Sequence, residues 1–127
     1  MPQGKVFLVD DDASVRKALE RLIRSAGYDV VSVGDPAAYM ACVAPTPPAC
    51  LVLDIRMPGM SGFDLHSAVE GTAWALPTVF ITGHGSEDVR MQALLSGAVD
   101  VLFKPVDETT LLTAIEKALE VPPARRS

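Results

Sequence analysis

Three groups of charged residues follow short apolar runs in this sequence, and together they could bind a metal ion and a phosphate. Asp54 closes one run (51–53), Asp10-Asp11-Asp12 follows another (6–9), and Lys104 follows a third (99–103). An aspartate at a strand end either caps the next turn or is presented at the edge of the sheet, and for Asp54 alone capping is the commoner role. Three strand ends with charges of matching type favour one shared site.

The acidic residues predict a divalent cation. Asp11 and Asp54, with Asp10 close behind, would place like charges together, which costs free energy unless a cation neutralises them. The donors are all oxygen, and no His or Cys is placed to join them. This set suits Mg²⁺ with retained waters better than zinc or a full calcium cage.

A phosphate would complete the site. Lys104 could bind phosphoryl oxygens as a point charge, and the Thr82 hydroxyl could donate to them. Asp54 is the group placed as a nucleophile, because a carboxylate can attack phosphorus without a general base. The product would be an acyl phosphate, formed where metal, lysine and hydroxyl spread the charge of an in-line transfer.

The elements that position these residues alternate along the chain. Apolar runs predict five strands, over residues 6–9, 29–33, 49–54, 76–82 and 99–103, each followed by a helical segment. This order predicts a doubly wound α/β domain, with a parallel sheet covered by helices on both faces. In such sheets the ligand site lies at the carboxyl ends of the strands.

Apolar spacing also predicts which helix faces point inward. We expect helices after Asp12, after Asp35-Pro36 to about residue 43, after Ser61, after Ser86, and after Asp107 or Thr109. Their predicted inward stripes are Val15, Ala18, Leu19, Leu22, Ile23 and Ala26; Leu65, Ala68 and Val69; Met91, Leu94, Leu95 and Ala98; and Leu111, Leu112, Ile115, Ala118 and Leu119.

Composition limits the classes of function. The 127 residues fit one domain, which we assign to residues 1–121, with residues 122–127 as a tail or the start of an interdomain linker. A net charge of -5, with Arg125-Arg126 the only basic run, argues against direct nucleic-acid contact. No signal peptide or membrane span is present, which predicts a soluble, cytoplasmic protein.

Cys42 and Cys50 are interpreted as small buried hydrophobic residues.

Four short motifs, in this order along the chain, resemble those of the receiver domain of response regulators in two-component signalling. They are Val9-Asp10-Asp11, Leu53-Asp54-Ile55-Arg56-Met57-Pro58, Ile81-Thr82-Gly83 and Lys104-Pro105, and the resemblance covers nearly the whole chain. Residues 81–85 and 97–100 are similar to the receivers of FixJ-like regulators, which precede a helix-turn-helix output domain. The resemblance implies a flavodoxin-like sheet with strand order 2-1-3-4-5.

Carried over by position, the resemblance implies that Asp54 accepts a phosphoryl group from a sensor histidine kinase. Asp11, Asp54 and the main-chain carbonyl of Arg56 would bind Mg²⁺, with Asp10 assisting through a water molecule.

The same resemblance implies roles around the phosphoryl group. Lys104 would pair with it, Thr82 would swing toward it, and the backbone N–H groups of Arg56 and Gly83 would complete its cradle. The Lys104–Pro105 peptide bond would be cis. A homodimer could form on phosphorylation through the fourth helix, fifth strand and fifth helix.

One residue departs from the family pattern. Three residues before the lysine the family commonly has Tyr or Phe, whose rotation follows the threonine, and here that residue is Val101. Valine has one stiff χ1 angle and cannot swing in or out of a pocket. We therefore expect the conformational change to involve the backbone after Thr82 or the fourth helix.

Several polar or aromatic residues have simpler interpretations. His84 could contact a partner or modulate the lifetime of the phosphoryl group, although an exposed histidine more often does neither. His66 is interpreted as a polar surface residue and Trp74 as a packing residue in a surface loop. Asp12 is interpreted as the N-cap of the first helix rather than as a metal ligand.

Proteins of other classes were weighed against the receiver. An aspartyl phosphatase or transferase usually has a second Asp two residues after the nucleophile, where this chain has Arg56, so we predict a regulatory domain with at most self-catalysed phosphorylation and dephosphorylation. A flavodoxin-like binding module would need a phosphate loop without the repelling triplet at 10–12. A stand-alone receiver acting as a phosphorelay intermediate or phosphate sink, and a phosphorylation-independent docking module, remain alternatives.

Overall fold

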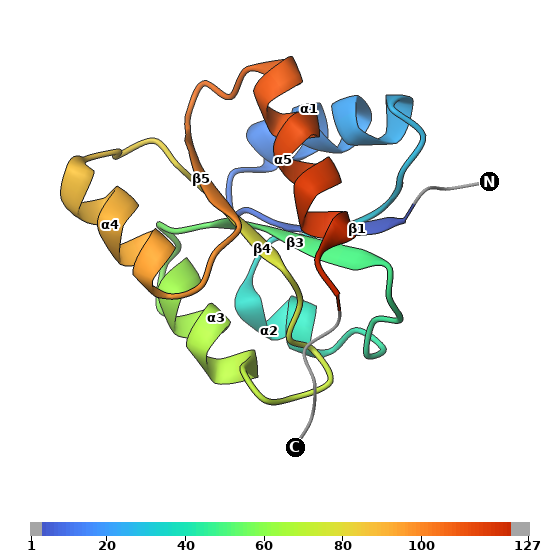
Figure 1. Ribbon diagram of the computed structural model, residues 1–127, viewed down its shortest axis with the longest axis horizontal. Helices are drawn as coiled ribbons and strands as arrows, with labels where there is room; N and C mark the ends of the chain where they lie inside the picture. The colour runs from blue at the N-terminus through green and yellow to red at the C-terminus, as the bar shows by residue number, and fades with distance from the viewer. Residues whose placement is uncertain (1–3, 123–127) are drawn as a thin grey trace.

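Five parallel strands form one sheet between two layers of helices in the computed structural model, which describes residues 4–122 (Figure 1). The strands are β1 (Lys5–Val9), β2 (Asp29–Val33), β3 (Ala49–Asp54), β4 (Thr78–Thr82) and β5 (Asp100–Phe103). The helices are α1 (Ala13–Ser25), α2 (Pro36–Met40), α3 (Gly62–Val69), α4 (Glu87–Leu95) and α5 (Glu108–Glu120). The strand order is β2-β1-β3-β4-β5, and all neighbours run parallel. The predicted doubly wound fold and strand order are confirmed.

The sheet has two apolar faces, as expected for a parallel sheet covered on both sides. One face packs against α1 and α5 through Leu19, Ile23, Leu111 and Ile115. The opposite face packs against α2, α3 and α4 through Tyr39, Leu65, Val69 and Ala93. Every residue of the central strand β3 is buried, including its terminal aspartate. The fold therefore holds Asp54 in the middle of the sheet, at its carboxyl edge.

Each helix begins with a polar side chain that accepts a backbone N–H from its first turn. These N-caps are Asp12, Asp35, Ser61, Ser86 and Asp107. The predicted capping role of Asp12 is confirmed, because its carboxylate accepts from the N–H groups of Ser14 and Val15. Of the two predicted starts for the last helix, Asp107 is the N-cap.

Two predicted elements were too long. The second helix ends at Met40 instead of continuing to about residue 43, and the fourth strand begins at Thr78 instead of Leu76. The strand starts after Pro77, whose nitrogen has no hydrogen to give to a strand ladder. Pro77 still accepts a hydrogen bond from Leu51 through its carbonyl.

The prediction for the inward face of α4 was wrong. Met91, Leu94 and Leu95 are 54 %, 43 % and 80 % exposed, whereas Ala93 is completely buried. The small side chain of Ala93 lets the helix approach the sheet closely, and this turns the larger residues outward. Ala98 lies beyond the helix, which ends before Gly97 at a φ of 93°.

Smaller differences concern single side chains. Ala18 and Ala68 are exposed rather than inward-facing, and Cys42 is only partly buried, whereas Cys50 is fully buried. His66 is not a simple surface residue: it is partly buried and its ring meets Phe80 edge-on.

Trp74 packs as predicted at the surface. Its indole N–H donates to the carbonyl of Cys42, and its own carbonyl accepts from the hydroxyl of Tyr39. The connection before β3 is thereby tied to the connection before β4.

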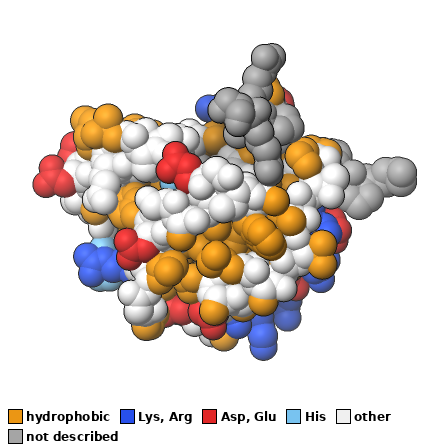
Figure 2. Space-filling model, turned by 90° about the horizontal axis from the view of Figure 1, so that it is seen from below, with side chains coloured by type: hydrophobic (Ala, Val, Ile, Leu, Met, Phe, Trp, Pro, Cys, Tyr) orange, Lys and Arg blue, Asp and Glu red, His pale blue; other side chains and the backbone are white. Residues whose placement is uncertain are grey.

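The underside of the molecule is partly apolar. Seen from below, the face that carries α2 and α3 shows a broad gathering of apolar side chains with charged groups around its margin (Figure 2). Met40 at the end of α2 and Val43 just after it are 43 % and 90 % exposed.

Two predictions concern residues outside the described range. The basic pair Arg125-Arg126 and most of the tail predicted at 122–127 lie beyond Pro122. Within residues 4–122, none of the helices combines the length and the apolar character that a membrane crossing requires.

Candidate functional site

Three carboxylates meet where β1 and β3 end side by side. Asp10 directly follows β1, Asp11 comes next, and Asp54 is the last residue of β3. One oxygen from each of the three carboxylates lies within 4.8 Å of the others. Asp10 is completely buried and Asp54 is 3 % exposed, whereas Asp11 is exposed to solvent. The cluster is therefore open on the side of Asp11 and enclosed on the sheet side.

Lys104 reaches this cluster from the end of β5. Its Nζ lies 3.0 Å from Asp10 Oδ2 and 3.4 Å from Asp54 Oδ2. The main-chain N–H of Lys104 donates to the carbonyl of Thr82, which holds the lysine beside the end of β4. The Lys104–Pro105 peptide bond is cis, as the resemblance implied.

Burial and neighbouring charge perturb the ionisation of the site. Burial, with a further contribution from the Asp10 carboxylate, raises the pKa of Asp54 to about 6, against an ordinary value of 3.8. Lys104 and the N–H of Arg56 act in the opposite direction without cancelling this rise. Burial by itself would lower the pKa of Lys104, but its contacts with Asp10 and Asp54 outweigh burial and raise it. Lys104 therefore stays protonated and charged, whereas the ionised form of Asp54 is disfavoured relative to a carboxylate in water.

The donor set fits a hard divalent cation. Asp10 Oδ2 is buried, and among residues 4–122 its charged partner is the Lys104 ammonium at 3.0 Å. Three carboxylates opposite one ammonium leave negative charge uncompensated. Only oxygen ligands are gathered here, which favours magnesium chemistry over zinc.

Backbone and hydroxyl groups surround Asp54. The N–H of Arg56 donates to Asp54 Oδ1 at 3.2 Å. Thr82 ends β4 and is completely buried, and its Oγ1 accepts the N–H of His84 at 3.1 Å. The hydroxyl is thus engaged with the following loop. Gly83 opens that loop, and a Cβ placed on it would lie 4.0 Å from Lys104 Cδ.

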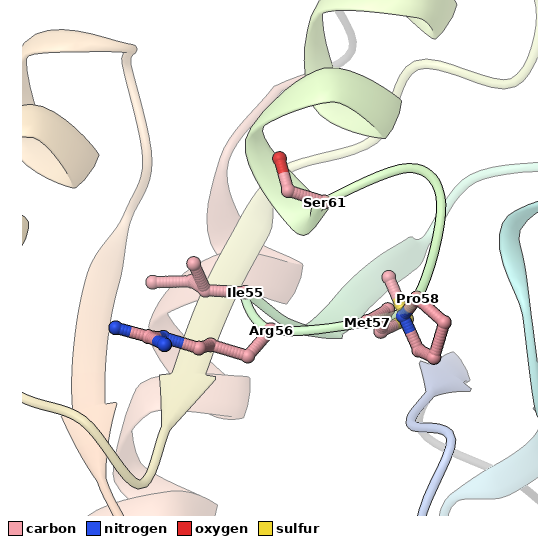
Figure 3. Close-up of a pocket in the computed structure, with 5 residues that line it drawn as sticks. All are labelled: Ile55, Arg56, Met57, Pro58 and Ser61. Carbon is pink, nitrogen blue, oxygen red and sulfur yellow. The ribbon is translucent and has the colours of Figure 1, made fainter.

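A hollow of about 430 Å³ lies on the loop that follows Asp54. Its lining residues are Ile55, Arg56, Met57, Pro58 and Ser61 (Figure 3). In this view the Arg56 side chain extends away from Met57 and Pro58. The surface next to the acidic cluster therefore has room for a second molecule to approach.

Two residues that shape the site were missed from the sequence. Arg16 Nη1 donates to the carbonyl of Asp10 at 2.7 Å, which holds the end of β1. Gly62 begins α3 against the end of β3, where a Cβ would meet the Asp54 carbonyl oxygen and come within 2.9 Å of Ile55 Cα. Arg16 has no signal beyond its place one turn into α1, but the glycine directly after the Ser61 cap could have indicated a close approach.

Other residues considered from the sequence lie apart from the cluster. His84 is exposed and contributes its N–H to Thr82, while His66 packs on Phe80. Burial lowers the pKa of His66 and keeps its ring neutral. Val101 is buried at 2 % exposure in the core beneath α4.

An acidic cluster and a lysine at the carboxyl edge of a 2-1-3-4-5 parallel sheet define a class of protein. The family model described as "Response regulator receiver domain" matches residues 6–116. The chain therefore belongs to the response regulator receiver domain family.

Individual relatives support this assignment. Nodulation protein W of Bradyrhizobium diazoefficiens is 40 % identical over 95 % of this chain and 53 % of its own length, and transcriptional regulatory protein FixJ of the same organism is 34 % identical over 98 % and 62 %. The crystal structure of FixJ-N superposes with a TM-score of 0.86 at 34 % identity and covers 98 % of this chain and all of that one. Response regulator StyR gives a TM-score of 0.82 at 42 % identity over 92 % and 59 %. The chain spans about half the length of the first of these curated relatives.

Proposed function

We propose that this domain is a phosphoacceptor switch, in which Asp54 receives a phosphoryl group from the phosphohistidine of a sensor histidine kinase. The observation that carries the proposal is the buried Asp54 carboxylate, with Lys104 Nζ at 3.4 Å and the carboxylates of Asp10 and Asp11 beside it. Burial and the Asp10 carboxylate raise the pKa of Asp54, and a perturbed carboxylate beside a lysine supports a functional role for this residue.

Magnesium is the proposed cofactor. Asp11, Asp54 and the main-chain carbonyl of Arg56 would hold it, with Asp10 assisting through a water molecule. When bound, the cation supplies positive charge to the oxygens of the group in transfer. The negative charge that one ammonium leaves uncompensated on three carboxylates supports this assignment.

The proposed transfer uses the residues as follows. A carboxylate oxygen of Asp54 attacks phosphorus, an O–P bond forms, and the N–P bond to the histidine breaks so that the imidazole leaves with the bonding electrons. Lys104 then exchanges its carboxylate contact for one with the phosphoryl oxygens. The N–H groups of Arg56 and Gly83 donate to the same oxygens. The hollow of about 430 Å³ beside Arg56 gives the donor histidine access.

We propose that the switch acts on other protein surfaces and that its role is regulatory. The Thr82 hydroxyl would leave the N–H of His84 and turn to the phosphoryl group, which alters the loop leading into α4. A homodimer on phosphorylation would use the face of α4, β5 and α5, where Leu94, Leu95 and Phe103 are exposed. Relatives with names such as transcriptional regulatory protein FixJ support an output domain for transcription, and residues 1–121 would be the receiver unit that controls it.

The test is the intact mass of the protein after incubation with acetyl phosphate, with and without Mg²⁺. We expect one added phosphoryl group in wild type, dependent on Mg²⁺, and none in Asp54→Asn. Wild-type protein that binds Mg²⁺ and gains no mass would contradict the proposal and leave a phosphorylation-independent docking module.

A further inference from the structure

Phe103, the last residue of β5, lies against the loop that follows Thr82. Its side chain is 40 % exposed, yet the ring covers Gly85 so closely that a Cβ there would stand 2.7 Å from Phe103 Cγ and nearer still to the ring edge. Gly85 does not have a positive φ, so its backbone would tolerate a side chain. The ring alone excludes one at this position.

The same loop is held at its other end by the phosphoryl site. The N–H of His84 donates to Thr82 Oγ1 at 3.1 Å, and the position of a Cβ on Gly83 is 4.0 Å from Lys104 Cδ. Thr82 pairs with Phe103 across the β4–β5 ladder. Residues 83–85 therefore lie between the threonine and the end of β5, and the ring of Phe103 packs on Gly85.

Phe103 is also on the side of the sheet where an aromatic switch could act. It is two residues after Val101, and side chains two apart in a strand point to the same face. Val101 is buried and stiff, whereas Phe103 stands at the solvent end of that face with one side of its ring on the loop. An aromatic group is thus in contact with the segment whose movement phosphorylation would require.

We infer that Phe103 is a positioning residue that holds the loop at 83–85 and, through the His84 N–H, keeps the Thr82 hydroxyl turned away from Asp54. This inference rests on the proposed function of Asp54. When Thr82 turns to the phosphoryl group, the loop shifts and the ring leaves Gly85. The free energy of the ring–glycine contact therefore opposes phosphorylation, and loss of the contact favours it.

The first test measures the rate of phosphorylation by acetyl phosphate at saturating Mg²⁺ in four variants. We expect Phe103→Ala to react roughly fivefold faster than wild type. Gly85→Ala should also react faster, because its methyl group displaces the ring. The double variant should be no faster than the faster single one, because both substitutions remove the same contact. Met40→Ala, which removes a comparably exposed apolar side chain (43 %) on α2, should react at the wild-type rate.

A second measurement separates this role from a merely structural one. In Phe103→Ala the amide of His84 should exchange faster with solvent by NMR, while the calorimetric affinity for Mg²⁺ stays at the wild-type value. A wild-type rate of phosphorylation in Phe103→Ala, rate increases that multiply in the double variant, or unchanged exchange at His84 would each overturn the inference. Wild-type protein that takes up no phosphoryl group would instead contradict the proposed function. Comparison of His84 amide exchange between wild type and Phe103→Ala would still test the contact of the Phe103 ring with Gly85.

A fluorine label on the phenylalanine rings would report the movement of Phe103 directly. Phe103 is the most exposed of the four phenylalanines, since Phe7 and Phe80 are buried and Phe63 is partly buried. Fluorophenylalanine incorporated at all four positions should give a resonance, assigned by its loss in Phe103→Leu, that is replaced by a shifted resonance whose intensity follows the phosphorylated fraction. A resonance that stays fixed while the mass shows full phosphorylation would overturn the inference.

Discussion

Asp54 is a residue whose charge is costly in the metal-free fold. It is 3 % exposed and lies beside Asp10, and these surroundings raise its pKa to about 6 from an ordinary 3.8. An acid whose pKa is higher in the folded than in the unfolded chain holds its proton more tightly when folded. Stability therefore falls as the pH rises from about 4 to about 6, and the whole cost is present above that range. A cation at the site would offset the cost.

We predict that Asp54→Asn stabilises the metal-free protein near neutral pH by about 3 kcal/mol, because the pKa of Asp54 rises from 3.8 to about 6 and one unit of pKa corresponds to about 1.4 kcal/mol. The gain should shrink toward zero at about pH 4, where wild-type Asp54 is protonated in the folded protein. Urea unfolding in the presence of EDTA at both pH values measures the difference. A gain of equal size at both pH values would show that ionisation of Asp54 is not its source.

At the level of residues, the sequence predicted the members of the site better than their contacts. Asp10, Asp54 and Lys104 were found because strand ends of a parallel sheet meet at one edge. The 3.0 Å contact of Lys104 with Asp10 and the packing of Phe103 on Gly85 depend on side-chain rotamers and on which strands are neighbours. Neither can be read from spacing along the chain.

Among the elements, α3 begins in direct contact with the end of β3. Gly62 donates its N–H to the carbonyl of Ile55 at 2.8 Å, and the Ser61–Asp64 capping box fixes where the helix begins. The close approach leaves no space for a side chain at residue 62. The position of α3 therefore determines how the end of β3 presents Asp54.

We predict that Gly62→Ala destabilises the protein by about 2 kcal/mol, as overpacking typically does, although alanine is the better helix former. The same change should slow phosphorylation, because the methyl group displaces the backbone of Asp54. Ser67→Ala on the exposed face of α3 is the control and should stay within about 0.5 kcal/mol of wild type. Chemical denaturation of both variants tests this, and a Gly62→Ala protein as stable as the control would contradict the described packing.

The helix α4 shows where periodicity fails as a guide. The spacing of its apolar residues 91, 94 and 95 predicts a buried stripe. The helix, however, lies at the end of the sheet beside β5, and the residue that it buries fully is Ala93. Hydrophobic spacing identifies a face that avoids water, and a face intended for another protein chain gives the same signal. The sequence alone does not distinguish the two.

At the scale of the whole molecule, this outward stripe is the surface we assign to dimerisation. We predict that phosphorylated wild type dimerises and that Leu95→Glu remains monomeric while it still gains one phosphoryl group. Leu95 is 80 % exposed, so the charge should not disturb the monomer's fold. Light scattering of the phosphorylated proteins is the measurement, with Val43→Glu, 90 % exposed near α2, as the control that still dimerises. A Leu95→Glu dimer as stable as that of the control would exclude this face.

The overall architecture was predictable because it depends on pattern rather than on detail. Five apolar runs separated by helical segments allow few arrangements other than a parallel sheet with helices on both faces. The resemblance to receivers supplied the strand order, which alternation alone does not specify. Output and partners depend on surfaces, and their residues carry no local signal comparable to an aspartate at a strand end.

Asp54 itself is the residue that we propose carries the phosphoryl group. Reduction of the phosphorylated protein with borohydride converts an aspartyl phosphate to homoserine, and peptide mass mapping then locates the changed residue without any substitution. We expect homoserine at residue 54 and at no other aspartate, and only in samples phosphorylated with Mg²⁺ present. Homoserine at residue 10 or 11, or an unchanged Asp54 in protein that has gained the phosphoryl mass, would contradict it.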